Sequence, residues 1–301
     1  MAGTFVILLL LLAVAAPSFF QTQPLLSLCS REAPVLLLTC GIAFVIVCRE
    51  IDISIGSQFS VCSVCAGLLC TMQWPLASAF LVSIVFGAAM GAINGGLIAG
   101  LRLPSIVVTL ATMVFWREGL RWLRQGQFVN LPDNIQWLGF SQVVGQRVII
   151  STALLLFAAL GLANRSIAGF RFIYAIGSDR ESARLAGIRT QLVTFLVFVA
   201  MGVFAGLAAA LNMVQSPQVD PKAGTGLELK AIAAAVVSGI AISGGRGSLW
   251  AVIAGVALLG TIGPALTHLH VQAYWEKALQ GTVILIAVVG EHFRQRRRQG
   301  A

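Results

Sequence analysis

The stretch Leu192–Met213, LVTFLVFVAMGVFAGLAAALNM, decides the fold class, because it contains no ionisable side chain from end to end. A helix needs about 20 apolar residues to cross a hydrocarbon core about 30 Å thick. The whole chain has the same character, since 58% of its 301 residues are hydrophobic and only 10% are charged. Soluble proteins carry about 25% charged residues. The sequence therefore predicts an integral membrane protein that has lipid as its main solvent.

Other apolar runs raise the expected number of membrane-spanning helices to about ten. The expected spans are roughly 4–19, 33–48, 58–72, 76–100, 106–123, 148–163, 192–213, 228–242, 249–267 and 278–290. Ten spans place both termini on one side, and the arginine clusters within 165–189 and 294–298 indicate that this side is cytoplasmic. We expect an all-α, polytopic membrane protein with some helices broken or re-entrant. A single transmembrane domain would cover 1–301, with a periplasmic loop at 124–147 and a cytoplasmic loop at 164–191.

The formal charge of +9 comes from arginines and lysines that lie mainly between apolar runs and near the C-terminus. These positions are typical of residues that set membrane topology, so we expect no binding of nucleic acid. The six cysteines are interpreted as small buried side chains, because no His pair or second CxxC accompanies Cys62 and Cys65. The segment Gly244–Gly247 lacks the GK[ST] ending of a phosphate-binding loop. We therefore expect no metal site, no bound cofactor, no catalytic residues and no ATP hydrolysis by this chain.

Three breaks rich in Gly and Ser, at 49–57, 223–226 and 243–248, interrupt apolar runs. They are either ordinary loops between spans or broken helices that line a transport site. A carboxylate such as Asp52 is costly near lipid, so we expect it to pair with Arg49, to cap the next helix or to contact a polar solute. Asn94, Thr109 and Thr112 fit either helix packing or solute contact. The candidate solute pathway comprises Asp52, Ser54, Ser57, Asn94, Thr109 and Thr112.

The polar segment Ser178–Gly187, SDRESARLAG, predicts a short capped helix outside the membrane. Ser178 or Asp179 can act as the N-cap, acidic residues occupy the first turn, and Gly187 suits the position after the C-cap.

Seven blocks, in chain order, resemble the permease subunits of ribose-type ATP-binding-cassette sugar importers, a family that serves ribose, xylose, arabinose, rhamnose and autoinducer-2. The blocks are IDISIGS at 51–57, GAING at 91–95, LPSIVVTLATM at 103–113, FIYAIG at 172–177, ARLAGI at 183–188, GTGLEL at 224–229 and SGGRGS at 243–248. Their order along more than four-fifths of the chain makes the resemblance far more specific than any single block.

The resemblance implies a multi-pass protein of the bacterial inner membrane that works with several partners. These would be cytoplasmic ATPase subunits that use the ATP, a second permease that is either identical or a related chain, and a periplasmic sugar-binding protein. It also implies that the short helix couples the permease to the ATPase. The residues expected in this role are Ser178, Asp179, Glu181, Arg184, Leu185 and Gly187.

The resemblance leaves the transported solute open. The segment 125–142 is similar to rhamnose permeases, so a rhamnose- or pentose-like monosaccharide is the main expectation, with autoinducer-2 as the alternative. From a different class, an ion-coupled secondary transporter could use Asp52 as its buried acidic relay.

Overall fold

The computed structural model describes residues 17–269 and, beyond them, residues 272, 275, 277–283, 285 and 289. Positions 4–16 of the first expected span, part of the tenth (284, 286–288 and 290) and the arginine cluster at 294–298 therefore lie outside the described residues. The elements are η1 Pro17–Phe20, α2 Thr22–Val47, α3 Ile55–Thr71, α4 Leu76–Gly95, the π-helix η2 Gly96–Gly100, α5 Ser105–Arg124, β1 Val129–Asn130, η3 Gln136–Gly139, α6 Gln142–Ser166, α7 Ala168–Ser178, α8 Arg180–Leu185, α9 Thr190–Met213, β2 Gln218–Val219, α10 Leu227–Val237, η4 Leu249–Ala251 and α11 Val252–His268.

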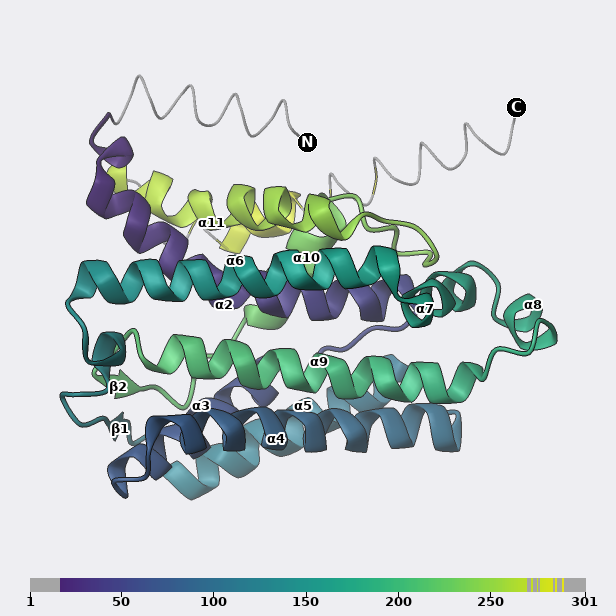
Figure 1. Cartoon of the computed structure of the whole chain (residues 1–301), viewed down its shortest axis with the longest axis horizontal. Helices are drawn as coiled ribbons and strands as arrows, with labels where there is room; N and C mark the ends of the chain where they lie inside the picture. The colour runs from purple at the N-terminus through teal and green to yellow at the C-terminus, as the bar shows by residue number, and fades with distance from the viewer. Residues whose placement is uncertain are drawn as a thin grey trace.

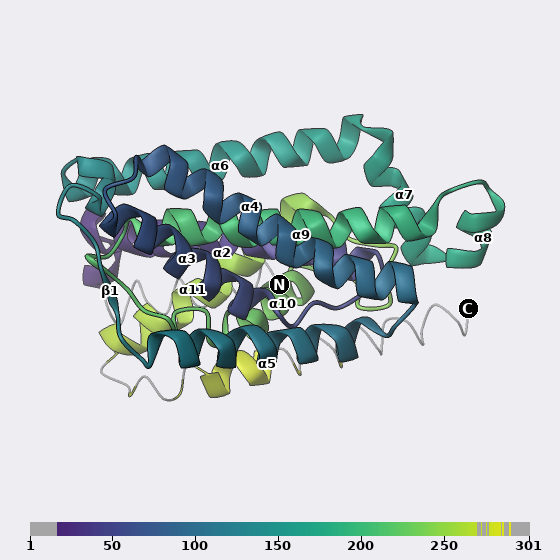
Figure 2. The same cartoon turned by 90° about the horizontal axis from the view of Figure 1, so that it is seen from below.

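Helix α2 lies at the centre of an elongated bundle and packs against α6, α9, α10 and α11 (Figure 1). From Ala33 to Val47 every residue of α2 is buried. Its apolar side chains therefore face protein all round, whereas a surface helix has only one apolar stripe facing protein. Helix α5 runs along the edge of the bundle away from α6 (Figure 2).

Five helical segments of the described part are long and apolar enough to cross a membrane. They are α2, α4 continued by η2, α6, α9, and η4 continued by α11. The chain is thus a polytopic helical membrane protein, as the sequence predicts. Helix α2 starts at Thr22, well before the expected position 33. Pro24 does not prevent this, because a proline in the first turn removes an N–H that has no helical partner.

Two expected spans are shorter than a full crossing. Helix α3 has 17 residues, and α10, expected to reach position 242, has 11 and ends at Val237. Ser238 follows as the C-cap and Gly239 takes a φ of 97°, which turns the chain out of the helix. Both helices follow non-helical stretches, 48–54 before α3 and 214–226 before α10.

The two ends of the bundle differ in character (Figure 1). At one end β1 pairs antiparallel with β2, with Val129 opposite Val219, a pairing that the sequence did not predict. The loop that precedes α6 is held there as well, since the Trp137 N–H donates to the Val214 carbonyl over 2.6 Å. At the opposite end lie α7 and α8.

Helices α4 and α9 approach each other more closely than side chains would allow. A Cβ atom on Gly87 would meet the carbonyl oxygen of Gly202, and one on Gly202 would meet that of Gly87. Gly91 and Gly206 face the backbone of the opposite helix in the same way. Small residues permit such backbone contact, which provides packing energy where lipid is the solvent.

Replacing Gly202 by Val should therefore push α4 and α9 apart and lower the free energy of unfolding by about 2 kcal/mol or more. The matched control is Gly119→Val on α5, where an added Cβ meets nothing within 4 Å. We expect a lower Tm for Gly202→Val in detergent and almost no change for Gly119→Val. Equal Tm values for the two variants would contradict the close packing.

Candidate functional site

The chain between α2 and α3 is a short non-helical segment inside the bundle, defined here as the first break, residues 48–54. Arg49 turns the chain with a left-handed φ of 66°, and α3 does not begin until Ile55. An unwound segment exposes backbone groups that lipid cannot satisfy. The first break therefore depends on partners supplied by the protein itself.

Asp52 is the centre of the polar cluster that satisfies the first break, and its side chain is fully buried. Its Oδ1 accepts from the backbone N–H of Ser54 at 2.8 Å and from the Ser54 hydroxyl at 2.6 Å. Its Oδ2 accepts from Nε2 of Gln58 at 3.3 Å. These three donors offset part of the cost of burying a carboxylate without a cation beside it.

Asn94 joins the same cluster from α4. Its Nδ2 donates to the Ser54 hydroxyl oxygen at 2.9 Å, and that oxygen also accepts from Nε2 of Gln58 at 2.8 Å. The amide oxygens of Gln58 and Asn94 are buried and have no hydrogen-bond partner among the described residues. Ser54 therefore connects the first break to both α3 and α4.

Three of the six residues predicted for the solute pathway thus come together, namely Asp52, Ser54 and Asn94. Ser57, Thr109 and Thr112 donate their hydroxyls to backbone carbonyls of their own segments, at 2.7, 2.8 and 3.0 Å. The Thr109 hydroxyl also lies 3.4 Å from the Ile51 carbonyl of the first break. Gln58 was missed, although its position four residues after Ser54 places both side chains on one helix face. All three clustered side chains are covered by protein, so they make no solvent contact in this conformation.

The expected pair between Arg49 and Asp52 is wrong. Arg49 is exposed, and it forms no ion pair with any described acidic residue. The carboxylate that forms an ion pair in this segment is Glu50, whose Oε1 lies 3.2 Å from Nη1 of Arg180 on α8. Asp52 instead accepts hydrogen bonds from Ser54, the residue that precedes α3. This arrangement is close to the expected role of Asp52 as a cap of that helix.

The second predicted break, at 223–226, meets the first break in space. Gly56 and Gly224 are in backbone contact, so a Cβ atom on either residue would collide with the backbone of the other. The Gly224 N–H donates to the Ser60 hydroxyl at 3.0 Å. Glu228 accepts from the Gly226 N–H at 3.1 Å and pairs with Arg117 of α5 at 3.0 Å. The starts of α3 and α10 are therefore fixed to each other.

The third predicted break, at 243–248, packs on the end of α2. The Gly245 N–H donates to the Val47 carbonyl at 2.9 Å. Gly177, near the end of α7, leaves no room for a Cβ beside Val47 and Gly245. The motifs around 49–57, 172–177 and 243–248, far apart in sequence, therefore form one junction next to α8.

Helix α8 is capped at both ends as the sequence predicts. Asp179 is the N-cap, and its carboxylate accepts from the N–H groups of Glu181 and Ser182 at 2.9 and 3.2 Å. The hydrogen bond from the Ser182 hydroxyl is the largest of the effects that lower the pKa of Asp179. Ser178 does not serve as the cap. Gly187, with a φ of 84°, ends the helix, while the N–H of Ile188 donates to the carbonyl of Ala183.

The outer face of α8 is open to a partner. Leu185 is 77% exposed, and the Glu181 and Arg184 side chains form an exposed ion pair of 2.6 Å. The inner side is anchored by Arg180, which binds Glu50 and donates to the Thr194 hydroxyl at 2.7 Å. Arg180 thus connects α8 directly to the first break and to α9.

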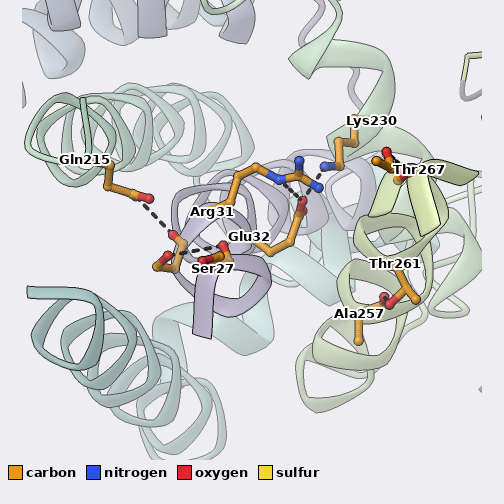
Figure 3. A network of polar contacts seen from close by, with 10 residues as sticks. Ser27, Arg31, Glu32, Gln215, Lys230, Ala257, Thr261 and Thr267 are labelled. Atoms are coloured by element: carbon orange, nitrogen blue, oxygen red, sulfur yellow. Dashed lines mark hydrogen bonds and ion pairs between the residues drawn. The ribbon is translucent and has the colours of Figure 1, made fainter. Parts of the chain in front are cut away.

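A separate ion-pair network ties the opposite part of the bundle together (Figure 3). Glu32 of α2 accepts from Nζ of Lys230 on α10 at 2.8 Å and lies 3.5 Å from Nε of Arg31. Gln215 donates to the Ser30 carbonyl at 3.0 Å. These contacts are structural ties between α2, α10 and the end of α9. Among the described residues, no group of three or more His, Cys, Asp or Glu side chains could hold a metal ion.

Comparison with known proteins gives consistent matches over almost the whole chain. A family model described as the permease component of the branched-chain amino acid transport system matches residues 25–288. The autoinducer 2 import system permease protein LsrC of Yersinia enterocolitica is 33% identical over 280 residues, covering 93% of this chain and 78% of the relative. The protein of that name from Escherichia coli O157:H7 is 32% identical over 289 residues, covering 94% and 84%. No solved structure matches significantly.

Replacing Asp52 by Leu should lower the free energy of unfolding by about 2 kcal/mol or more, because it leaves the N–H and the hydroxyl of Ser54 buried without their acceptor. Asp52→Asn should cost less, since its oxygen still accepts from Ser54 and Gln58 can turn its unpartnered oxygen toward the new amide. The control is Asp133→Leu, at an exposed aspartate. We expect the order Asp133→Leu, Asp52→Asn, Asp52→Leu for increasing loss of Tm. An unchanged Tm in Asp52→Leu would show that the cluster does not hold the first break.

Proposed function

The chain belongs to the family described as the permease component of branched-chain amino acid transport systems, and we propose that it is the membrane-spanning subunit of a bacterial ATP-binding-cassette importer of the inner membrane. The matches confirm the resemblance stated from the sequence blocks. The curated relatives are permease proteins of an import system, so a transport role without catalysis by this chain agrees with them. ATP would be used by separate cytoplasmic subunits.

For the transported solute we propose autoinducer-2. The sequence alone favours a rhamnose- or pentose-like monosaccharide first and autoinducer-2 second. The relatives favour the second, because they are named as autoinducer 2 import permeases and align over more than nine-tenths of this chain. Monosaccharides remain the comparison solutes in the test.

The observation that supports coupling most directly is the bridge from α8 to the first break. A docking helix must present an open face to the ATPase and be fixed to the spans on its other side. Helix α8 has both properties, with Leu185 exposed and Arg180 bound to Glu50. Movement of α8 would therefore reach the first break, and through Ser54 it would reach α3 and α4.

The solute pathway would involve α3 and α10, which follow the first and second breaks, together with a second permease. The starts of α3 and α10 meet at Gly56 and Gly224, and Arg117 of α5 is bound to Glu228 beside them. Only four residues of the 20-residue helix α5 are buried, so most of its surface is available to the second permease. Asp52, Ser54 and Asn94 would contact the solute only after the bundle opens, because all three are now covered.

For the orientation, we propose that the end with α7 and α8 is cytoplasmic and the end with β1 and β2 is periplasmic (Figure 1). Arginine residues accumulate around α7 and α8, at the end of α6 and at the start of α9, which agrees with the excess of positive charge on cytoplasmic segments. This orientation agrees with the expected arrangement of about ten spans with both termini cytoplasmic, although both termini lie outside the described residues.

Cells that express this chain with its neighbouring ATPase and binding-protein genes should take up labelled autoinducer-2, and an ATPase-dead variant should abolish uptake. An importer needs ATP hydrolysis at a partner subunit, whereas an ion-coupled transporter does not. Labelled rhamnose and ribose are the comparison solutes. Full uptake with the dead ATPase would contradict the proposal and favour ion coupling through Asp52. Uptake of rhamnose alone would show that rhamnose, and not autoinducer-2, is the transported solute.

Replacing Arg180 by Ala should uncouple the importer, with uptake falling by about tenfold while ATP hydrolysis continues. Replacing Glu181 and Arg184 together by Ala should abolish uptake by removing the docking face, with membrane expression unchanged. Arg147→Ala, at an exposed arginine on α6 near the other end of the bundle, is the control. Both ATP hydrolysis and uptake are measured in reconstituted vesicles. Normal uptake in the α8 variants would show that this helix does not transmit the ATPase motion.

A further inference from the structure

An apolar groove of about 760 Å³ opens on the side of the bundle between α6, α7 and α9. Exposed side chains that include Ile167, Phe172, Leu192 and Leu196 line it, and Arg189 is its single charged lining residue. Helices α6 and α9 are both candidate membrane spans, so bilayer lipid is the solvent that surrounds this groove. Its lining matches the acyl chain of a lipid.

A second hollow of about 670 Å³ adjoins the groove at α8 and the end of η2. The two cavities share Ile188, Arg189 and Leu192 in their linings. The second hollow is strongly basic, because its charged lining residues are Arg102, Arg180, Arg184, Arg189 and a single acid, Glu181. An apolar surface thus passes directly into a basic one at Arg189.

Two of these four arginines already have carboxylate partners. Arg180 is paired with Glu50, and Arg184 is paired with Glu181. Arg102 and Arg189 are exposed and form no ion pair with any described acidic residue. The hollow therefore has two guanidinium groups available to an anion.

We propose that this composite surface binds one anionic phospholipid, with an acyl chain in the groove and the phosphate between Arg102 and Arg189. Basic pockets at the ends of spans attract anionic headgroups, and arginine suits phosphate because its planar fork donates two parallel hydrogen bonds. The bound lipid would lie between α7, α8 and α9, the elements that hold the short helix against the bundle.

A lipid explains both halves of the surface better than a soluble partner. A free phosphate would use the arginines but leave the apolar groove uncovered. A protein that docks on α8 would reach the basic hollow, but the groove continues along α9 as far as Val203 and Phe204, between candidate spans. Because the apolar groove and the basic hollow meet at Arg189, only an occupant with one apolar part and one anionic part would fill both.

The test uses the purified full chain in a neutral detergent, titrated with dioleoyl phosphatidylglycerol or dioleoyl phosphatidylcholine. Retained lipid is read by native mass spectrometry and stabilisation by Tm. We expect tighter retention and a larger rise in Tm with phosphatidylglycerol, and no effect of inorganic phosphate. The double variant R102Q/R189Q should weaken phosphatidylglycerol binding by about tenfold. Ala200→Trp, which fills the groove, should weaken it with every arginine in place.

Arg147→Gln removes the same charge near the opposite end of α6 and should leave binding unchanged. The Tm of each variant in phosphatidylcholine shows whether it is folded. Equal retention of the two lipids, normal phosphatidylglycerol binding by R102Q/R189Q, or an equal loss in Arg147→Gln would overturn the proposal. Stabilisation by inorganic phosphate alone would assign the arginines to a soluble anion.

Discussion

The fold depends on one constraint, which is that a chain unwound inside a bilayer must satisfy its own polar groups. The first break meets this constraint through the Asp52 carboxylate, which accepts the Ser54 N–H, the Ser54 hydroxyl and the Gln58 amide. Asn94 extends the same cluster to α4. Removing the carboxylate would leave the N–H and the hydroxyl of Ser54 without their acceptor at a fully buried position. The polar cluster is therefore a structural element of the membrane domain, whether or not it also meets the solute.

The same break connects the membrane domain to its exposed end. Glu50 lies two residues before Asp52 and binds Arg180, so the segment that holds the buried cluster also holds α8. On its other side, the break continues into α3, which meets the start of α10 at Gly56 and Gly224. A displacement of α8 can therefore reach both α3 and α10, through the ion pair at Glu50 and the backbone contact between Gly56 and Gly224. Such contiguous packed elements are the physical means by which domain motions are transmitted.

Much of this arrangement could be predicted from sequence, because membrane helices and caps have strong local signals. The uncharged run at Leu192–Met213 and the capped segment ending at Gly187 are examples. The partner of Glu50 could not be predicted, since it lies on another element and the ion pair does not form with Arg49, the nearest cation in sequence. The pairing of β1 with β2 and the existence of α7 were also missed. Two-residue strands have almost no local signal. The amphipathic α7 lies within the segment 164–191, which was predicted to be a loop because it contains many charged residues.

The most direct test of the account is whether α8 and the first break move as one body. Glu50 and Arg180 are replaced by Cys in a chain without its native cysteines, and a bifunctional methanethiosulfonate reagent of matched length joins them through two disulfides that a reductant cleaves. Uptake of the solute in vesicles with the ATPase is then measured before and after reduction. We expect the cross-linked protein to transport at least as well as the reduced one, because the link replaces an ion pair that persists through the cycle. Loss of uptake on cross-linking, restored by reduction, would show that the two segments separate during transport.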